Sequence, residues 1–293
     1  MDWRDGRRSN NVDDARNSPA SSGIGGLGLL LRFVPYLIGT KIGRIILLIG
    51  GLGYFCMHFL GVDTGKLLNG TASSVKVAPS DQDKELVDFV SVVLATTEDI
   101  WRAEFQKMGK TYQDPHLTLF RGSVQSGCGL ASSATGPFYC PADNNLYIDL
   151  SFYQDLKNKL GAPGDFAQAY VIAHEVGHHV QNLLGISRNV RQAMQRKPQS
   201  IANALSVKQE LQADCFAGIW AHYTKTEKKM VQEGDIEEAL AAAAAVGDDK
   251  LQQQASGTVR PEKFTHGTSK QRAQWFNTGF ESGNIETCNT FKN

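Results

Sequence analysis

The segment HEVGHH at residues 174–179 combines residue types that hold a metal ion with one that can move a proton. In a helix, His174 and His178 are one turn apart and share a face, so two imidazoles can bind one Zn²⁺ from the same side. Glu175 is rotated by about 100° and lies beside such an ion, where it can act as a general base. This is the H-E-x-x-H pattern of zinc peptidases. The alternative is core histidines satisfied by hydrogen bonds, and His179, on another face, is expected to be structural.

A catalytic zinc usually has three protein ligands, so a further ligand must come from elsewhere in the chain. The extended motif with a third histidine is excluded, because Gln181 and Leu184 stand at its glycine and histidine positions. In KQELQADCFAGIWAH, residues 208–222, Glu210 and Asp214 are one turn apart on a largely apolar helix, where unpaired carboxylates would be costly. We predict that Glu210 binds zinc and that Asp214 accepts a hydrogen bond from a ligand histidine. The main alternative reverses these two roles.

A hydrogen-bond donor beside the metal would stabilise the oxyanion that forms during peptide hydrolysis. His266, in THGTSKQRAQWF, is the candidate for this role. It precedes an expected helix whose start is marked by the capping pair Thr268 and Gln271, with Arg272 one turn in. On the sequence alone, an unremarkable loop histidine remains the simpler interpretation.

Several helices and a few strands must position these residues. Apolar residues at helical spacing predict helices over 165–184, about 200–225, 235–246 and 268–280, and a further helix after Asp81. The segments HLTLFRG and NNLYIDLSF alternate apolar and polar residues and are predicted strands. Helix-rich segments after a few strands indicate an α+β domain with a small sheet. The strand NLYIDL is a candidate edge for binding extended substrate by β-addition.

An apolar stretch separates the N-terminus from this domain. Residues 45–62 carry no Lys, Arg, Asp or Glu, and we predict a transmembrane helix over 42–62, about long enough to cross a bilayer. The alternatives are a buried core helix, which normally keeps a polar face, and a cleaved signal peptide, which would follow an unusually long leader. The run 24–40 is interrupted by Arg32 and Pro35 and is interpreted as interfacial.

Basic residues set the expected orientation of the span. Arg32 and Lys41 precede it, Arg44 lies in its first turn and Lys66 follows it, so the positive-inside rule places the N-terminus in the cytoplasm. Residues 1–23 have little apolar content and are expected to be disordered. The predicted organisation is a cytoplasmic disordered tail with a juxtamembrane segment (1–41), a transmembrane helix (42–62), a linker (63–80) and an extracytoplasmic zinc metallopeptidase domain (81–293).

The charge balance limits the partners that the protein can bind, and the cysteine content indicates the cellular compartment. The 293 residues contain 30 basic and 30 acidic side chains, and this balance argues against nucleic acid as a partner. Outside the predicted span, which holds Cys56, there are four cysteines, an even number that fits an oxidising compartment. The favoured pairs are Cys128–Cys140, the nearest in sequence, and Cys215–Cys288 by default; free buried thiols are the alternative.

Four motifs occur together in a fixed order: GPFYCPADNNLYIDLSF, HEVGHHVQ, ELQADCFAGIWAH and HGTSKQRAQWF. With the start MDWRDGRRSNNVDDAR, they resemble the bacterial neutral zinc metallopeptidase family (YpfJ-like proteins) over nearly the whole chain. The resemblance implies a zincin-like fold, Zn²⁺ as cofactor, a gluzincin-type HExxH…ExxxD site and a bacterial inner-membrane location with the domain in the periplasm. It also strengthens His266 and Arg272 as site residues. It names no substrate.

The resulting expectation is a membrane-anchored zinc endopeptidase that acts on a peptide or protein. The zinc ligands would be His174, His178 and Glu210, with Glu175 as general base and His266 as oxyanion donor. The alternative is a non-catalytic envelope protein or adaptor that uses zinc only structurally.

Overall fold

The computed structural model describes residues 1–16 and 81–292, which belong to one compact unit. Among the helices in these ranges, none is both long and apolar enough to cross a membrane. The transmembrane helix predicted over 42–62 and the linker over 63–80 lie outside the described residues.

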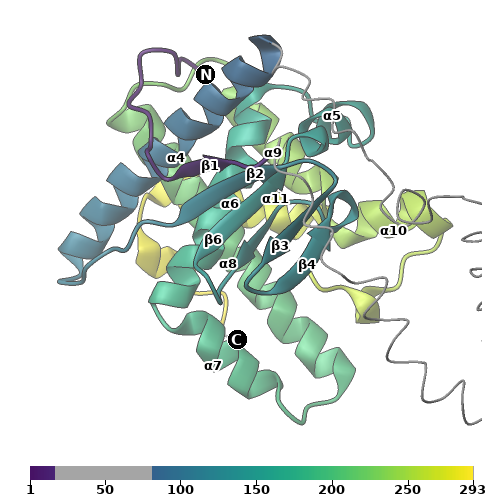
Figure 1. Ribbon diagram of the computed structural model, residues 1–293. Helices are drawn as coiled ribbons and strands as arrows, with labels where there is room; N and C mark the ends of the chain where they lie inside the picture. Colours follow the sequence, from purple (N-terminus) through teal and green to yellow (C-terminus); the bar gives the residue numbers. More distant parts are fainter. Residues whose placement is uncertain (17–80, 293) are drawn as a thin grey trace, which may run out of the picture. The chain divides into compact units, whose positions relative to one another are not determined.

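The described part of the chain is a helix-rich α+β structure, which confirms the predicted class (Figure 1). Its α-helices are α4 (Asp81–Lys107), α5 (Ser151–Asn158), α6 (Asp165–Leu183), α7 (Ile186–Met194), α8 (Gln199–Thr226), α9 (Asp235–Ala245), α10 (Asp248–Ser256) and α11 (Ser269–Ser282). Its strands are β1 (Val12–Asp14), β2 (His116–Phe120), β3 (Ser123–Ser126), β4 (Gly129–Ser132), β5 (Phe138–Cys140) and β6 (Asn145–Asp149).

Four strands form the main sheet, in the order β1-β2-β6-β5. The first three are parallel and β5 runs antiparallel to β6, while β3 and β4 make a separate hairpin. The prediction that NLYIDL is an edge strand is therefore wrong. This segment forms β6, which lies inside the sheet, and β5 is the edge strand beside it. Alternating polarity along a strand shows which face is buried but not which neighbours the strand has.

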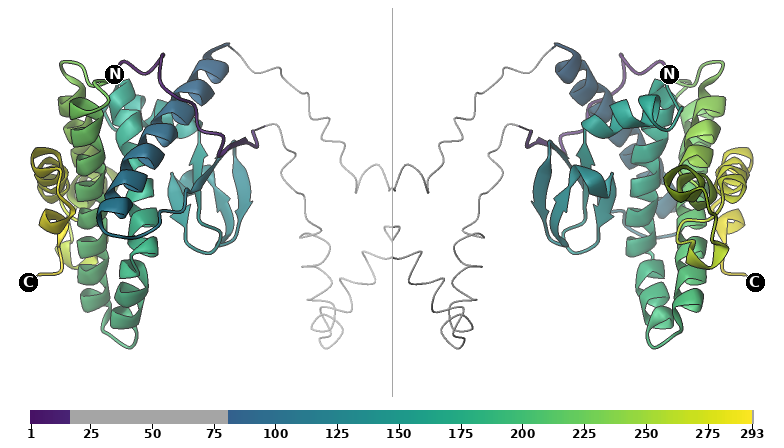
Figure 2. Two further views of the ribbon diagram at one scale, coloured as in Figure 1. Left: turned by 90° about the vertical axis from the view of Figure 1, so that its left-hand side faces the viewer. Right: turned by 90° about the vertical axis from the view of Figure 1, so that its right-hand side faces the viewer.

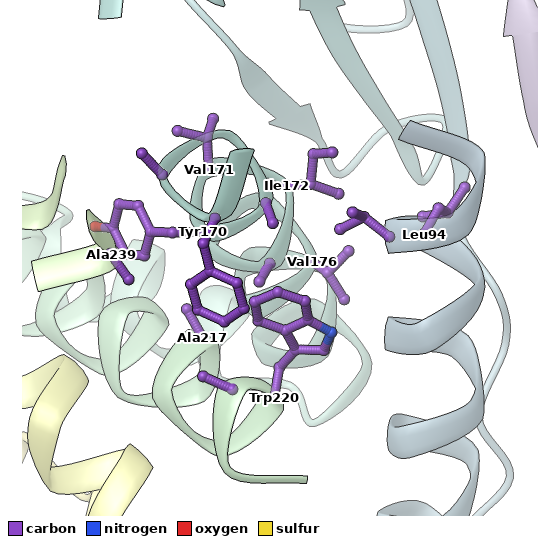
Figure 3. Close-up of a cluster of buried hydrophobic side chains, with 14 of the residues drawn as sticks. Leu94, Tyr170, Val171, Ile172, Val176, Ala217, Trp220 and Ala239 are labelled. Carbon is purple, nitrogen blue, oxygen red and sulfur yellow. The ribbon is translucent and has the colours of Figure 1, made fainter. Parts of the chain in front are cut away.

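The helices gather on one side of the sheet (Figure 2). Helix α6 is the central one, because apolar residues surround almost its whole circumference. Trp220 of α8 stacks on Phe166 of α6, and the core continues through Val176 toward Leu94 of α4 (Figure 3). A single dominant core thus holds the HEVGHH helix in place.

Three glycines let the helices that carry the polar residues approach one another closely. A Cβ atom at Gly177 of α6 would lie 2.9 Å from the carbonyl oxygen of Ala213 on α8. Between α8 and α11, Gly218 and Gly279 each face the backbone of the other helix in the same way. These contacts bring α6, α8 and α11 to within reach of one another's short polar side chains.

The expected disorder of residues 1–23 is wrong for residues 1–16. Strand β1 extends the sheet beside β2, and Trp3, only 5% exposed, packs edge-on against Phe89 of α4. The composition of this segment shows that it cannot form a core of its own. It becomes ordered because it adds a few apolar residues to a core that the rest of the domain supplies. The folded domain is therefore 1–16 together with 81–292.

Two disulfides join separate elements of the domain. The pairs are the ones that the sequence analysis favoured. Cys128–Cys140 ties the β3–β4 turn to β5, and Cys215–Cys288 ties α8 to the C-terminal 3₁₀ turn Ile285–Cys288.

Candidate metal centre

Three side chains predicted as zinc ligands converge between α6 and α8. His174 Nε2 lies 3.2 Å from Glu210 Oε2, and His178 Nε2 lies 3.3 Å from Glu210 Oε1. One ligand atom from each of the three residues lies within 4.8 Å of the others. The one-turn spacing on α6 and the missing side chain at Gly177 together produce this approach.

The other ring nitrogen of each histidine is already engaged. His174 Nδ1 is 2.9 Å from Asp214 Oδ1, and His178 Nδ1 is 2.9 Å from Gln181 Oε1. Both partners are acceptors, so each Nδ1 carries the proton and donates it. Both Nε2 atoms are then directed toward Glu210, and a metal that replaces the proton on Nε2 would meet their lone pairs there. Two neutral imidazoles and one carboxylate are a donor set that catalytic zinc sites use, so these residues fit Zn²⁺.

Asp214 is less suited than Glu210 to be the third ligand. It is fully buried, and its two oxygens accept hydrogen bonds from Arg272 Nε at 2.8 Å, Arg272 Nη2 at 2.9 Å, Tyr170 Oη at 2.5 Å and His174 Nδ1. Three of these bonds go to Oδ1 and one to Oδ2, so both oxygens already serve other donors. The geometry therefore favours Glu210 as ligand and Asp214 as the residue that orients His174.

Arg272 lies deeper than the sequence suggested. Its guanidinium is 4% exposed, holds Asp214 through two nitrogens and also donates to Tyr170 Oη at 3.2 Å. Burial by itself would raise the pKa of Asp214, but the charges of Arg272 and His174 hold it below its usual range. Arg272 thus keeps Asp214 ionised and supports the metal centre through it.

The charges around the two histidines favour a cation at the site. Burial lowers the pKa of His174, but the carboxylates of Asp214 and Glu210 outweigh it and raise the pKa to about 9. Burial also opposes a charge on His178, whose pKa is nevertheless raised by Glu210. The pKa of Glu210 would rise on burial, yet His178 and His174 hold it well below its usual range. A divalent cation would be stabilised by the same carboxylates.

His179 points elsewhere, as a structural residue would. Its Nε2 donates to the Gln113 carbonyl at 2.6 Å, and its Nδ1 is 3.0 Å from Tyr139 Oη. Burial lowers the pKa of His179 to about 4, so the ring stays neutral at physiological pH.

The three candidate ligands open onto a cavity of about 590 Å³. Glu175 and His266 line the same cavity, and Phe138, Phe152 and Val171 form an apolar wall. The His266 side chain is about half exposed, and its loop is fixed by Asp248, whose Oδ2 accepts backbone N–H groups of residues 265, 266 and 267. The structure thus brings all the predicted catalytic and metal residues to one hollow.

Sequence reasoning missed three residues of this arrangement: Tyr170, Gln181 and Asp248. Two of them carry a helical signal, since Tyr170 stands four residues before His174 and Gln181 three residues after His178. Asp248 had no such signal, because its role depends on a loop 17–19 residues away.

The whole chain matches one protein family. A family model described as "Putative neutral zinc metallopeptidase" covers residues 1–291. The chain belongs to this family. "Uncharacterized protein YpfJ" of Escherichia coli K12 is 52% identical over 291 residues, which is 99% of each chain. "Uncharacterized protein Mb2605" of Mycobacterium bovis is 42% identical over 250 residues, 79% of this chain and 84% of its own. No solved structure matches the chain.

Membership in the neutral zinc metallopeptidase family confirms the resemblance seen in the sequence and identifies Zn²⁺ as the cofactor. The family model extends over residues 1–16 as well as over the helices that carry the candidate ligands. In this member of the family, the side chains that could hold the ion are His174, His178 and Glu210, and the two histidines contact Asp214 and Gln181 through their other ring nitrogens.

Proposed function

We propose that this protein is a zinc-dependent endopeptidase that hydrolyses peptide bonds in a peptide or protein substrate. The observation that carries the proposal is the orientation of the two histidines. Their Nδ1 atoms are both occupied by acceptors, so their Nε2 atoms face Glu210 at one end of a cavity that Glu175 also lines. A purely structural zinc site is usually closed by four protein ligands, whereas this donor set has three and opens onto a hollow.

Each residue at the site has a chemical role in this proposal. Bound zinc supplies a Lewis acid that polarises the scissile carbonyl and makes water more acidic. Glu175 takes a proton from the water whose oxygen attacks the carbonyl carbon. As the C–N bond breaks, Glu175 passes that proton to the leaving amine. His266 donates a hydrogen bond to the oxyanion, and Asp214, held by Arg272, keeps His174 in the tautomer that binds metal.

We further propose a zincin-like arrangement in which substrate adds to strand β5. Residues Phe138 and Tyr139 of β5 line the cavity, and this strand is at the end of the sheet order. An extended peptide beside it would gain backbone hydrogen bonds, while alternate side chains would meet pockets. The wall of Phe138, Phe152 and Val171 favours an apolar side chain near the cleaved bond.

The apolar segment 42–62, predicted to be a transmembrane helix, supports the proposal that the protein is anchored in the bacterial inner membrane. We also propose that the domain lies on the periplasmic side, which is supported by its two disulfides because disulfides persist in an oxidising compartment.

The test compares wild type with Glu175→Gln and with Glu104→Gln, a matched change at a buried glutamate whose ion-pair partner is Lys107. All three should bind one zinc per chain. Wild type and Glu104→Gln should cleave members of a broad peptide library, while Glu175→Gln should lose about 10²–10⁴-fold in rate. If zinc-loaded wild type cleaves nothing, or Glu175→Gln cleaves as fast as wild type, the non-catalytic alternative replaces the peptidase.

A further inference from the structure

The N-terminal segment 1–16 is built into the domain by its backbone as well as by its side chains. Strand β1 pairs with β2 in the register Val12↔Leu117 to Asp14↔Leu119. Two more backbone bonds attach the segment at distant points: Ser9 N donates to Ser91 O at 3.0 Å, and Asp2 N donates to Met230 O at 2.8 Å. The segment therefore contacts the sheet, α4 and the chain after α8 along its whole length.

A buried carboxylate on α4 depends on this segment. Glu98 is 1% exposed, and its oxygens accept hydrogen bonds from the Ser9 hydroxyl, from Asn11 Nδ2 at 2.9 Å and from Arg7 Nη2 at 2.7 Å. The cation of its own helix, Arg102, stays 3.8 Å away. Without residues 1–16, Glu98 would lose most of the partners that offset the cost of burying its charge. The domain surface is thus specifically complementary to the segment.

The α-ammonium group of Met1 contacts the start of α6, the helix that carries the two candidate histidine ligands. It lies 2.7 Å from Asp165 Oδ1, at the first residue of α6, and 3.2 Å from Asp235 Oδ1 of α9. Burial opposes this charge, but the two carboxylates outweigh it and raise the pKa of the amino group.

The two ends of the described ranges also meet. Arg16 Nη1 lies 3.2 Å from Asp83 Oδ1 on the first turn of α4. Residues 16 and 83, the one before and the other after residues 17–80, are therefore in contact. A segment that crossed a bilayer once would put its ends about 30 Å apart, on opposite faces. The predicted single crossing, with the N-terminus in the cytoplasm and the domain outside, does not allow these contacts.

We propose that residues 1–16 and the zinc-binding domain lie on the same side of the membrane. This rests on the membrane anchoring proposed above. In the sequence, Lys41 and Arg44 stand between the apolar runs 24–40 and 45–62. The positive-inside rule then assigns the residues between the runs to the cytoplasm and both termini to the outside.

Cysteine labelling of the full-length protein in intact bacterial spheroplasts tests the topology. The reporters are Asn10→Cys, at an exposed position of the segment, and Gln254→Cys, at an exposed position of α10. Both are placed in a Cys56→Ser background, since the other four cysteines form disulfides. A membrane-impermeant maleimide should label both reporters to the same extent before lysis. Asp5→Cys, also exposed, is a second reporter for the segment.

The outcomes separate this proposal from the proposed function. If Gln254→Cys is labelled while Asn10→Cys and Asp5→Cys are protected until lysis, the termini lie on opposite sides and the proposal is overturned. If all three reporters are protected until lysis, the same-side topology holds, but the periplasmic location of the domain fails.

Discussion

Replacing Asp214 by asparagine tests two roles of this carboxylate: it neutralises the buried charge of Arg272, and it orients His174. Asp214 is fully buried, with Arg272 at 2.8 Å and 2.9 Å and His174 Nδ1 at 2.9 Å. An asparagine keeps the size of the side chain but removes its charge. The guanidinium of Arg272, 4% exposed, is then left as an uncompensated buried charge. Breaking one partner of such a pair costs about 3–5 kcal/mol, so metal-free Asp214→Asn should lose roughly that much stability.

The second effect of Asp214→Asn concerns zinc. Asparagine has one acceptor oxygen in place of two, and Arg272 competes for it, so the hydrogen bond that fixes the tautomer and ring orientation of His174 is weakened. Loss of such a partner typically lowers metal affinity 10–100-fold, which corresponds to roughly 1.4–2.8 kcal/mol. Stability is measured by urea denaturation with a chelator present, and zinc affinity by competition with a metal-binding dye.

Asp149→Asn is the matched control for Asp214→Asn. Asp149 is 2% exposed, and its oxygens accept hydrogen bonds from Gly122, Ser133 and Ser151. Its replacement should lower stability while leaving zinc affinity at the wild-type value. The reasoning is refuted if metal-free Asp214→Asn is within about 0.5 kcal/mol of wild type, or if its zinc affinity equals that of Asp149→Asn. A double change, Asp214→Leu with Arg272→Met, should regain stability but not zinc affinity.

Three other changes test the packing and the titration of the domain. Trp3→Ala should cost roughly 3 kcal/mol in urea denaturation, because Trp3 is buried against α4, and it should expose the N-terminal segment to protease; an unchanged cleavage pattern would contradict docking. Gly218→Ala should cost roughly 3 kcal/mol, because its Cβ would overlap the carbonyl oxygen of Phe276, and wild-type stability would show that α8 and α11 are further apart. Burial lowers the pKa of His179 from 6.5 to about 4, so between these values the unfolded chain binds more protons. Stability should therefore fall by about 3 kcal/mol as the pH drops through this window, and His179→Gln should flatten that slope.

The metal half of the site could be predicted from the sequence because it is local. His174, Glu175 and His178 stand on one helix, and helical geometry fixes which of them share a face. The contact between His178 and Gln181, one turn later, could be predicted in the same way, because a ligand histidine needs an acceptor for its other ring nitrogen. The α+β class followed from the balance of helical and alternating segments. The position of each strand in the sheet did not, because it depends on pairing between distant residues.

The N-terminal segment shows where composition misleads. Charge and low apolar content predicted disorder for residues 1–23, and that reasoning holds for a segment that must fold alone. Arg7, however, meets Glu98 and Asp99, and Trp3 meets Phe89, all 80 or more residues away. No pattern within a short stretch of sequence predicts contacts between residues so far apart in the chain. The membrane orientation expected from the charge bias stays a prediction, and the contact between Arg16 and Asp83 is the observation that supports the same-side topology proposed in its place.

The choice between Glu210 and Asp214 as third ligand depends on a third helix. Both acids are one turn apart on α8, so helical geometry alone treats them alike. Arg272, 58 residues after Asp214, distinguishes them by binding both oxygens of Asp214. That contact requires α11 to lie against α8, which the absence of side chains at Gly218 and Gly279 allows. A carboxylate paired with a guanidinium is a poor metal ligand, so Glu210, which faces the histidines, is the better candidate for the third ligand. It follows that Gly218→Ala should weaken zinc binding as well as folding, although it touches none of the three ligands.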